Sequence, residues 1–301
     1  MREPHVRGTT SQTTTDKERH MALRIITDSA SDIRQGEFEG LSVAPLSIAF
    51  GDRTYRDGVD LTGERFYEML VESEGLPTTG QVTPYGFSSL LEQVLAPDDE
   101  AVIITLSSKL SGTYQSACAA AAAFGERVRV VDSLSVCLGE RILVEYALRL
   151  AASGATASEV VSEVEARKGS IRLIALLDTL EYLRKGGRVS GLSASLGTML
   201  SIKPVIAVES GEVVVLGKAR GSKNGRNLLN EQIDRVGGAD YDLPIALGYS
   251  GLSSSLLQKY IRDSRSLWES QVDDLPVVMI GSTVGTHAGP GAIGVAFFSR
   301  R

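Results

Sequence analysis

The sequence predicts a two-domain α/β protein, in which an N-terminal α/β domain with a parallel sheet precedes a C-terminal α/β domain with a mixed, largely antiparallel sheet. Its 301 residues are enough for two domains of ordinary size. In the first half, apolar strand-like runs alternate with helical patterns, which is typical of a parallel sheet covered by helices. In the second half, two β-rich runs flank Ser210-Gly211, a pair typical of a hairpin turn. We place the domain boundary near Lys168, so that the domains span residues 22–168 and 169–301.

Composition narrows the class of protein. The chain is 43% hydrophobic and 23% charged, as soluble globular proteins are, and its net charge of -6 argues against a nucleic-acid partner. Because no apolar run approaches the roughly 20 residues that span a bilayer, we expect no transmembrane anchoring. Residues 1–21 are polar and carry no apolar core of a secretion signal, so we expect a disordered tail and a cytoplasmic protein. Cys118 and Cys137 form no metal or disulfide pattern, and Cys118 is expected to be buried in its helix.

The elements of the first half follow from its apolar patterns. Strands are predicted at LRIITD (23–28), LSVAPLSIAF (41–50), AVIITL (101–106) and RVRVVD (127–132). Helices are predicted at 63–73, at 84–95, after Gly112, from about Gly139 and at 158–168. The helix near Gly139 rests on apolar residues at helical spacing, namely Ile142, Leu143, Tyr146, Ala147 and Leu150.

The second half begins with a strand, RLIALLD (172–178), and a short helix. Asp178 and Glu181 have the spacing of a capping box, and Gly186 is placed to end this helix. After the hairpin at 204–219 we expect a strand in 243–251 and a helix that continues to about Trp268. Two final strands, 276–282 and 291–298, are predicted to be joined by a loop, TVGTHAGP.

The segment most informative about function is 101–124, AVIITLSSKLSGTYQSACAAAAAF. A buried strand ends in Ser107, Ser108 and Ser111 and restarts as an alanine-rich helix after Gly112. Hydroxyls and unpaired backbone N–H groups would gather there at the positive end of a helix dipole, which binds oxyanions. Alternatively, Ser111 only caps the helix. The segment alone leaves both interpretations open.

A second hydroxyl cluster lies at LPTTGQVTPYGF, residues 76–87, although Thr83-Pro84 is also a natural helix start. Arg188 follows the end of a predicted helix, where its guanidinium could pair with a carboxylate or phosphate. His287 is the one histidine inside a predicted folded segment, and its glycine-rich surroundings are expected to leave the imidazole uncrowded. Asp28 and Asp32 could serve a metal or acid–base chemistry, but helix capping explains them better.

Several familiar sites are absent from the sequence. It has no G-x-S-x-G elbow, no H-E-x-x-H and no strand-borne G-x-G-x-x-G. GEVVVLGKA resembles a phosphate loop only loosely, because it lacks the Ser or Thr after Lys218 and lies inside the predicted hairpin. We therefore expect no cofactor, no metal and no catalytic residue.

Nine motifs in order resemble the DegV family of bacterial fatty-acid-binding proteins. They run from about Arg24 to Phe298 and are ITDSASDI, APLSI, DGVDLT, LPTTGQVTP, ITLSSKLSGTYQSA, VVDSLSV, LEYLRKGGRVSG, KPVIAV and GTHAGPGAIG. The resemblance implies a two-domain α/β protein whose second domain holds a long apolar tunnel for one acyl chain. It also implies that Thr79 and Ser111 bind the carboxylate of a long-chain fatty acid.

In family members that serve a separate fatty acid kinase, the arginine of KGGR and the histidine of HTGPG are also implicated. Here these residues are Arg188 and His287. The resemblance thus implies a cytoplasmic acyl carrier of lipid metabolism that is not an enzyme by itself, with a kinase as a possible partner. This chain departs from the common pattern at Gly80 and Ala288, where two hydroxyls are missing.

Two rival functions remain open from the sequence. The family also resembles the dihydroxyacetone-binding part of dihydroxyacetone kinases, so His287 could hold a small carbonyl substrate covalently. An acyl transfer through Ser111 is the second rival, although the sequence supplies no convincing base for it.

Overall fold

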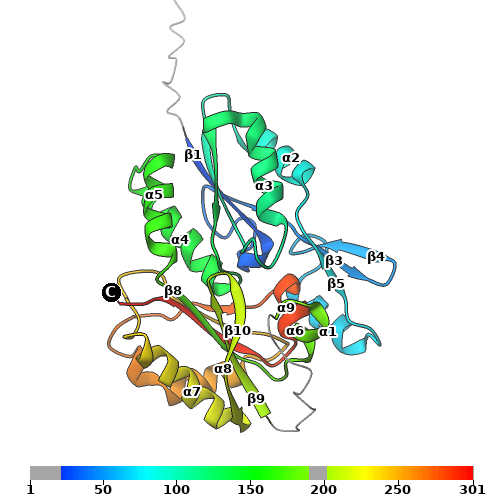
Figure 1. The fold of residues 1–301 in the computed structure, drawn as a ribbon, viewed down its shortest axis with the longest axis vertical. Coiled ribbons are helices and arrows are strands. Elements are labelled where there is room, and N and C mark those ends of the chain that lie inside the picture. Colours follow the sequence, from blue (N-terminus) through cyan, green and yellow to red (C-terminus); the bar gives the residue numbers. More distant parts are fainter. Residues whose placement is uncertain (1–21, 190–201, 301) are drawn as a thin grey trace, which may run out of the picture.

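The computed structural model describes residues 22–189 and 202–300, so the predicted tail at 1–21 lies outside the described residues. Two main sheets lie one beyond the other along the molecule, each covered by helices (Figure 1). This arrangement confirms the predicted mixed α/β class. Within the described residues, no helix is long and apolar enough to span a membrane.

The first sheet has four parallel strands in the order β2-β1-β6-β7. These strands are β1 (Leu23–Asp28), β2 (Leu41–Ala44), β6 (Glu100–Thr105) and β7 (Val128–Asp132). On one face, apolar side chains of the sheet pack against α2 and α3, and on the other against α4 and α5. The bounds of these helices are Pro84–Val94 for α2, Thr113–Ala121 for α3, Leu138–Ala152 for α4 and Ala157–Lys168 for α5. The parallel sheet covered on both faces is as predicted.

The predicted strand at 41–50 is wrong in one respect, because it is divided at Pro45. Proline has no N–H to donate to a ladder, so β2 ends at Ala44 and the chain leaves the first sheet. Its continuation joins a small antiparallel sheet in the order β4-β3-β5. The strands of that sheet are β3 (Ser47–Phe50), β4 (Arg53–Arg56) and β5 (Thr78–Gly80). The small sheet matters because β5 carries Thr79.

The second main sheet has the strand order β10-β9-β8-β13-β11-β12, and among these described strands only the β11–β12 pair is parallel. Its strands are β8 (Ile171–Leu176), β9 (Ile202–Glu209), β10 (Glu212–Arg220), β11 (Ala246–Tyr249), β12 (Val277–Met279) and β13 (Ile293–Phe298). The predicted hairpin is confirmed. Ser210 and Gly211 both have positive φ, of 50° and 87°, as a tight hairpin turn requires. Helices α7 (Gly221–Arg235) and α8 (Ser255–Asp263) cover one face of this sheet.

The segment TVGTHAGP is not a loop, because residues Ser282–Ala288 form the helix α9. Its first turn is fixed by carboxylates from the first half of the chain, since Asp32 accepts from the N–H of Gly281 and Asp57 from that of Thr283. Helix α1 (Gly63–Glu72) lies against α9, and Tyr67 donates to the carbonyl of Ile280 at 2.9 Å. Contacts distant in sequence therefore make this glycine-rich segment helical.

Two further expectations from sequence are wrong. Helix α6 (Glu181–Gly186) has no capping box, because the N–H of Glu181 binds the Thr179 hydroxyl while Asp178 pairs with Lys203. Cys118 is exposed on α3 and not buried. The remaining short helices are η1 (Ser29–Ser31), η2 (Ala122–Arg127) and η3 (Arg265–Leu267).

Helix α4 lies between the two main sheets (Figure 1). One continuous apolar cluster contains Ile142 of α4 together with Ile25 of the first sheet and Phe298 of the second. Because α4 serves both cores, the two halves of the molecule share their packing. The candidate site lies beside the N-terminal end of this helix.

Candidate ligand-binding site

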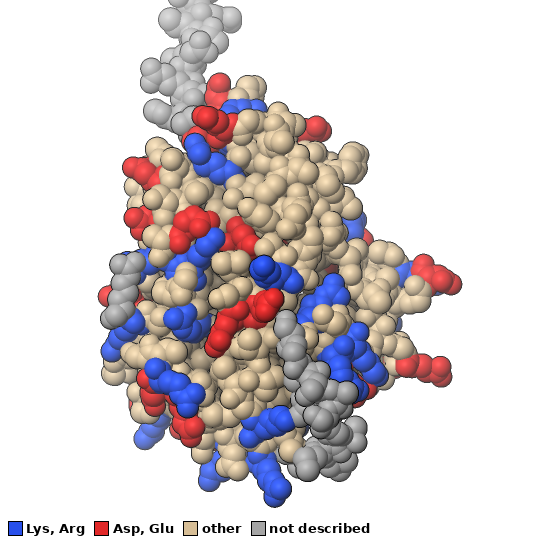
Figure 2. Space-filling model, viewed as in Figure 1, with Lys and Arg blue, Asp and Glu red and all other residues tan. Residues whose placement is uncertain are grey.

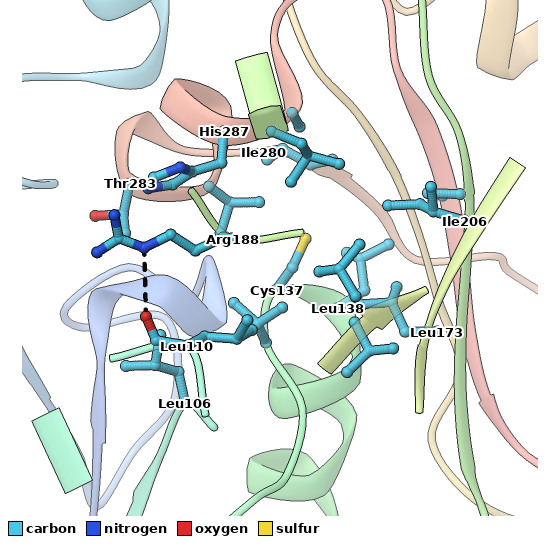
Figure 3. A pocket seen from close by; sticks show the side chains of 18 of the residues that line it. Leu106, Leu110, Cys137, Leu138, Leu173, Arg188, Ile206, Ile280, Thr283 and His287 are labelled. Carbon is cyan, nitrogen blue, oxygen red and sulfur yellow. Dashed lines mark hydrogen bonds between the residues drawn. The ribbon is translucent and has the colours of Figure 1, made fainter. Parts of the chain in front are cut away.

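An apolar cavity lies between the two halves of the molecule. Its lining includes Leu106 and Leu138 from the first half and Leu173 and Ile206 from the second (Figure 3). The centre of a water-sized molecule has about 120 Å3 of room, whereas a single water needs roughly 10–15 Å3. The resemblance implies a tunnel within the second domain, and the residues that line this cavity come from both sides of Lys168.

Polar groups gather at one end of the cavity. Figure 3 shows Arg188, Thr283 and His287 together at one side, while Leu173 and Ile206 lie at the opposite side. Between them the lining is almost entirely aliphatic. The cavity therefore has the polarity of an amphipathic molecule, with a polar head and an apolar tail.

Thr79 and Ser111, to which the resemblance assigns the carboxylate, both line this cavity. Thr79 is held by β5, whose backbone pairs with β3. Ser111 lies just before α3, where its hydroxyl oxygen accepts from the N–H of Thr113 at 3.2 Å and is 2.9 Å from the Thr113 hydroxyl. Its hydroxyl therefore satisfies a backbone N–H at the start of α3 and also lines the cavity, while oxyanion binding by Ser111 stays a prediction.

His287 contacts Thr79 directly, with 3.0 Å between its Nε2 and the threonine Oγ1. Burial, aided by the positive charge of Arg188, lowers the pKa of His287 from 6.5 to about 4, so the ring is neutral near pH 7. Its Nδ1 is buried with no hydrogen-bond partner among the described residues and faces Gly186, where a Cβ would lie only 2.2 Å away. The expectation of an uncrowded imidazole is wrong.

Arg188 is exposed at the mouth of the cavity. Its guanidinium donates to the carbonyl of Gly186 at 2.7 Å and to that of Leu110 at 3.5 Å, the latter drawn in Figure 3. None of the ion pairs in the part of the chain that the structure describes includes Arg188. Its charge is therefore held at the mouth by backbone carbonyls.

The other hydroxyls of the two predicted clusters have other roles. Ser107 donates to the carbonyl of Gly211 at 2.7 Å and so joins the first half to the β9–β10 turn. Thr83 caps α2 by accepting from the N–H of Gly86 at 3.0 Å. Neither Ser107, Ser108 nor Thr83 lines the cavity.

Asp28 and Asp32 are both buried. Asp28 caps η1 by accepting from the N–H of Ala30, as predicted, and also accepts from that of Leu106. Asp32 instead reaches Gly281, at 2.8 Å. Burial raises the pKa of each carboxyl from 3.8 to about 7, and the neighbouring carboxylate of Asp57 adds to the effect. Within residues 22–189 and 202–300, no group of three His, Cys, Asp or Glu side chains could hold a metal ion.

The sequence did not single out Gln81 or Thr283, although both line the polar end of the cavity. Gln81 donates to the Ser116 hydroxyl, and Thr283 donates to Asp57 at 2.6 Å. Their position in hydroxyl-rich or glycine-rich motifs was the only available signal. The apolar lining was missed because Leu173, Ala175 and Leu177 have the alternate spacing of ordinary strand residues.

The two-sheet architecture and this cavity define an α/β protein with a mainly apolar cavity between its two halves, polar at one end. The family model described as "Uncharacterised protein, DegV family" matches residues 22–300. The chain belongs to the DegV family.

Relatives by sequence extend over nearly the whole chain. A DegV domain-containing protein of Caldanaerobacter subterraneus subsp. tengcongensis is 35% identical over 280 residues, which cover 91% of this chain and 98% of the relative. One from Deinococcus radiodurans is 34% identical over 287 residues, covering 92% and 98%. The match confirms the resemblance drawn from the motifs.

Solved structures of similar fold bear names that refer to fatty acids. A DegV family protein from Thermus thermophilus, described for its fatty acid binding, is 31% identical with a TM-score of 0.82, covering 93% of this chain and 100% of that chain. One from Eubacterium eligens, loaded with heptadecanoic acid, is 26% identical with a TM-score of 0.80 and the same coverage. DegV of Bacillus subtilis, a fatty acid binding protein, is 27% identical with a TM-score of 0.79, again with the same coverage.

Proposed function

We propose that this protein binds one long-chain fatty acid in the cavity between its halves. The carboxylate is held by the hydroxyls of Thr79 and Ser111, and the tail extends toward β8 and β9. The observation that carries the proposal is the distribution of polarity in one cavity, with hydroxyls, an imidazole and a guanidinium at one end and aliphatic side chains beyond them. The fatty acids named for similar proteins support the same ligand class.

The neutral state of His287 fits this role. When its Nε2 carries the proton, it donates to the Thr79 oxygen at 3.0 Å, and the threonine hydrogen is free to point at the carboxylate. The environment of Nδ1 is consistent with this tautomer, because a buried N–H there would find no acceptor among the described residues. His287 thus orients the hydroxyl that binds the head group.

The tail supplies most of the affinity. Each buried methylene contributes about 0.8 kcal/mol, so a long chain binds tightly even when its carboxylate meets only neutral donors. Arg188 stands at the mouth with no carboxylate paired to it among the described residues, so its charge favours an acid there. The hydroxyls fix the orientation of the ligand in the cavity.

We further propose that the protein carries the acid in the cytoplasm and presents it to a separate fatty acid kinase, and is not an enzyme by itself. The exposed Arg188 beside the head group gives a partner protein a charged contact near the carboxylate. Figure 2 shows several blue side chains near α6, among red ones. Helix α6 includes Arg184 and Lys185, and Lys185 pairs with Glu181 of the same helix. The sequence has no nucleotide-binding motif, so such a partner would supply the ATP.

Ser111→Ala tests the proposed head-group contact. Losing a hydrogen bond to a carboxylate weakens binding by about 1.5–3 kcal/mol, roughly 10- to 150-fold in Kd. The matched control is Ser108→Ala, in the same segment but outside the cavity lining. Titration of both variants with palmitic acid checks the prediction, and an unchanged Kd for Ser111→Ala would remove that residue from the site.

The rival based on a covalent carbonyl adduct at His287 makes a different prediction. Both ring nitrogens are covered, Nε2 by Thr79 and Nδ1 by Gly186, so neither is open to a small substrate. In a thermal-shift assay we expect palmitic acid to raise the Tm and dihydroxyacetone to leave it unchanged. Stabilisation by dihydroxyacetone alone would contradict the lipid-binding proposal.

A further inference from the structure

We propose that the tail end of the cavity is closed by a wall one side chain thick, built from Leu173 and Val208, and that this wall restricts the site to acyl chains with a plain hydrocarbon end. The inference rests on the proposed function. It adds a specificity-determining feature at the end of the cavity opposite the carboxylate, and it names the class of ligand that is excluded, namely acids with a polar ω-terminus.

A second hollow lies directly behind this wall. Leu173, Ala207 and Val208 line both the cavity and a larger groove, in which the centre of a water-sized molecule has about 500 Å3 of room. The lining of the groove is mixed, since polar Arg172, Ser210 and Gln232 lie there beside apolar residues such as Leu216 and Val236. Among the described residues, the apolar cavity and the mixed groove share only Leu173, Ala207 and Val208.

The strand pairing explains why the wall is thin. The ladder between β8 and β9 ends at the pair Leu173 and Val208, and Arg172 turns its guanidinium to the carbonyls of Gly169 and Ile171. The pairing of these two strands stops there, so beyond this pair no ladder between β8 and β9 stands between the two hollows. Leu173 and Val208 are 7% and 9% exposed, as expected for side chains with a cavity on one side and a groove on the other.

The position of the wall fits the end of a bound tail. Figure 3 shows Leu173 at the opposite side of the cavity from Arg188 and His287. A ligand whose carboxylate lies at the polar end therefore directs its terminal methyl toward this wall. A hydroxyl on that terminus would be buried against aliphatic side chains without a partner, which weakens binding roughly 5- to 150-fold.

The test compares the longest saturated acid that the wild-type protein retains with the ω-hydroxy derivative of the same acid. The wild-type protein should bind the hydroxy acid at least about fivefold more weakly. In Leu173→Ala the terminus reaches the groove and its water, so the ratio of the two Kd values should fall close to one. The matched control is Leu177→Ala, the same truncation at a cavity-lining residue that does not line the groove, and it should keep the wild-type ratio.

Each variant is judged by the ratio of its Kd for the hydroxy acid to its Kd for the plain acid. A substitution that weakens the binding of both acids equally leaves this ratio unchanged. Should Leu173→Ala fail to fold, Val208→Ala is the alternative, because it truncates the smaller side chain of the same wall. It should also lower the ratio of the two Kd values. An unchanged ratio in the folded wall variants, a ratio near one in the wild-type protein, or an equal fall in Leu177→Ala would overturn the inference. Failure of the wild-type protein to bind any fatty acid would instead overturn the proposed function, and this inference with it.

Discussion

At the scale of single residues, the site depends on side chains that act through their neighbours. His287 contacts the Thr79 hydroxyl and so orients it. The His287 ring in turn fits against Gly186 only because glycine has no side chain. The sequence motifs identified Thr79 and His287 but gave no reason to expect a contact between them. The connection exists only because β5, α6 and α9 meet at the mouth of the cavity.

Gly186→Ala should disturb this chain of contacts. A methyl group there would lie 2.2 Å from the Nδ1 of His287, so the ring must shift and its contact with Thr79 weakens. We expect fatty-acid affinity to fall by about 1–2 kcal/mol, roughly five- to thirtyfold in Kd, measured by titration with palmitic acid.

Gly75→Ala is the control for this substitution, because a Cβ at Gly75 meets nothing within 4 Å. It should bind palmitic acid as the wild-type protein does. Equal affinities in Gly186→Ala and the wild-type protein would show that His287 does not orient Thr79.

At the scale of elements, α9 connects the two halves of the site. Its N-terminal amides bind Asp32 and Asp57, which belong to the first half, and its last turn carries His287. The glycine-rich sequence of this segment suggested a loop, because helix propensity is poor there and the carboxylates that complete its first turn are more than 200 residues away.

The contact between the Asp32 carboxyl and the N–H of Gly281 should depend on pH, because this carboxyl is buried and titratable. Its pKa is about 7 in the folded protein and near 3.8 in the unfolded chain, so the folded state binds more protons between these values. The contribution of Asp32 to stability is therefore full below about pH 4 and is lost as pH rises to about 7. An amide in place of this carboxyl would not titrate, and its oxygen could still accept from the N–H of Gly281.

For Asp32→Asn, we expect the unfolding free energy relative to the wild-type protein to rise with pH, by about 1–4 kcal/mol between about pH 4 and 7.5. Urea denaturation at several pH values measures this difference. Asp60→Asn is the control, since exposed Asp60 pairs with Arg56 and its pKa is lowered to about 2. A difference for Asp32→Asn that stays constant with pH would contradict burial of an ionisable Asp32.

At the scale of the whole molecule, the two halves behave as one packed unit around α4. The helix contributes Ile142 and its neighbours to a cluster that includes residues of both main sheets. We propose that the boundary between the halves lies between α5 and β8, near Lys168. The two halves can nevertheless unfold together, because α4 packs in the apolar cluster that both sheets share.

Unfolding should therefore be a single transition. Trp268 is the only tryptophan and is buried in the second half, beside Tyr260, so its fluorescence reports that half alone. Far-UV circular dichroism reports both halves. We expect the two signals to give coincident urea transitions. Separate midpoints would mean that the halves unfold independently.

The sequence predicted the parallel sheet, the hairpin at Ser210-Gly211 and the assignment to the DegV family. These features depend on local patterns and on ordered motifs, both of which a single chain displays. It did not predict the division of the strand at Pro45, the helix α9 or the walls of the cavity, because each depends on residues that meet only in the fold. Whether Thr79 and Ser111 bind a ligand stays a prediction, although both line one cavity.

The most direct test of the central claim is to identify what the protein carries. The chain would be purified without added lipid, weighed by native mass spectrometry, and then extracted under denaturing conditions to identify any released molecule. We predict an excess mass that corresponds to one acyl chain per protein, which the extract identifies as a fatty acid. A protein that is empty and that also fails to take up added fatty acids would contradict the account.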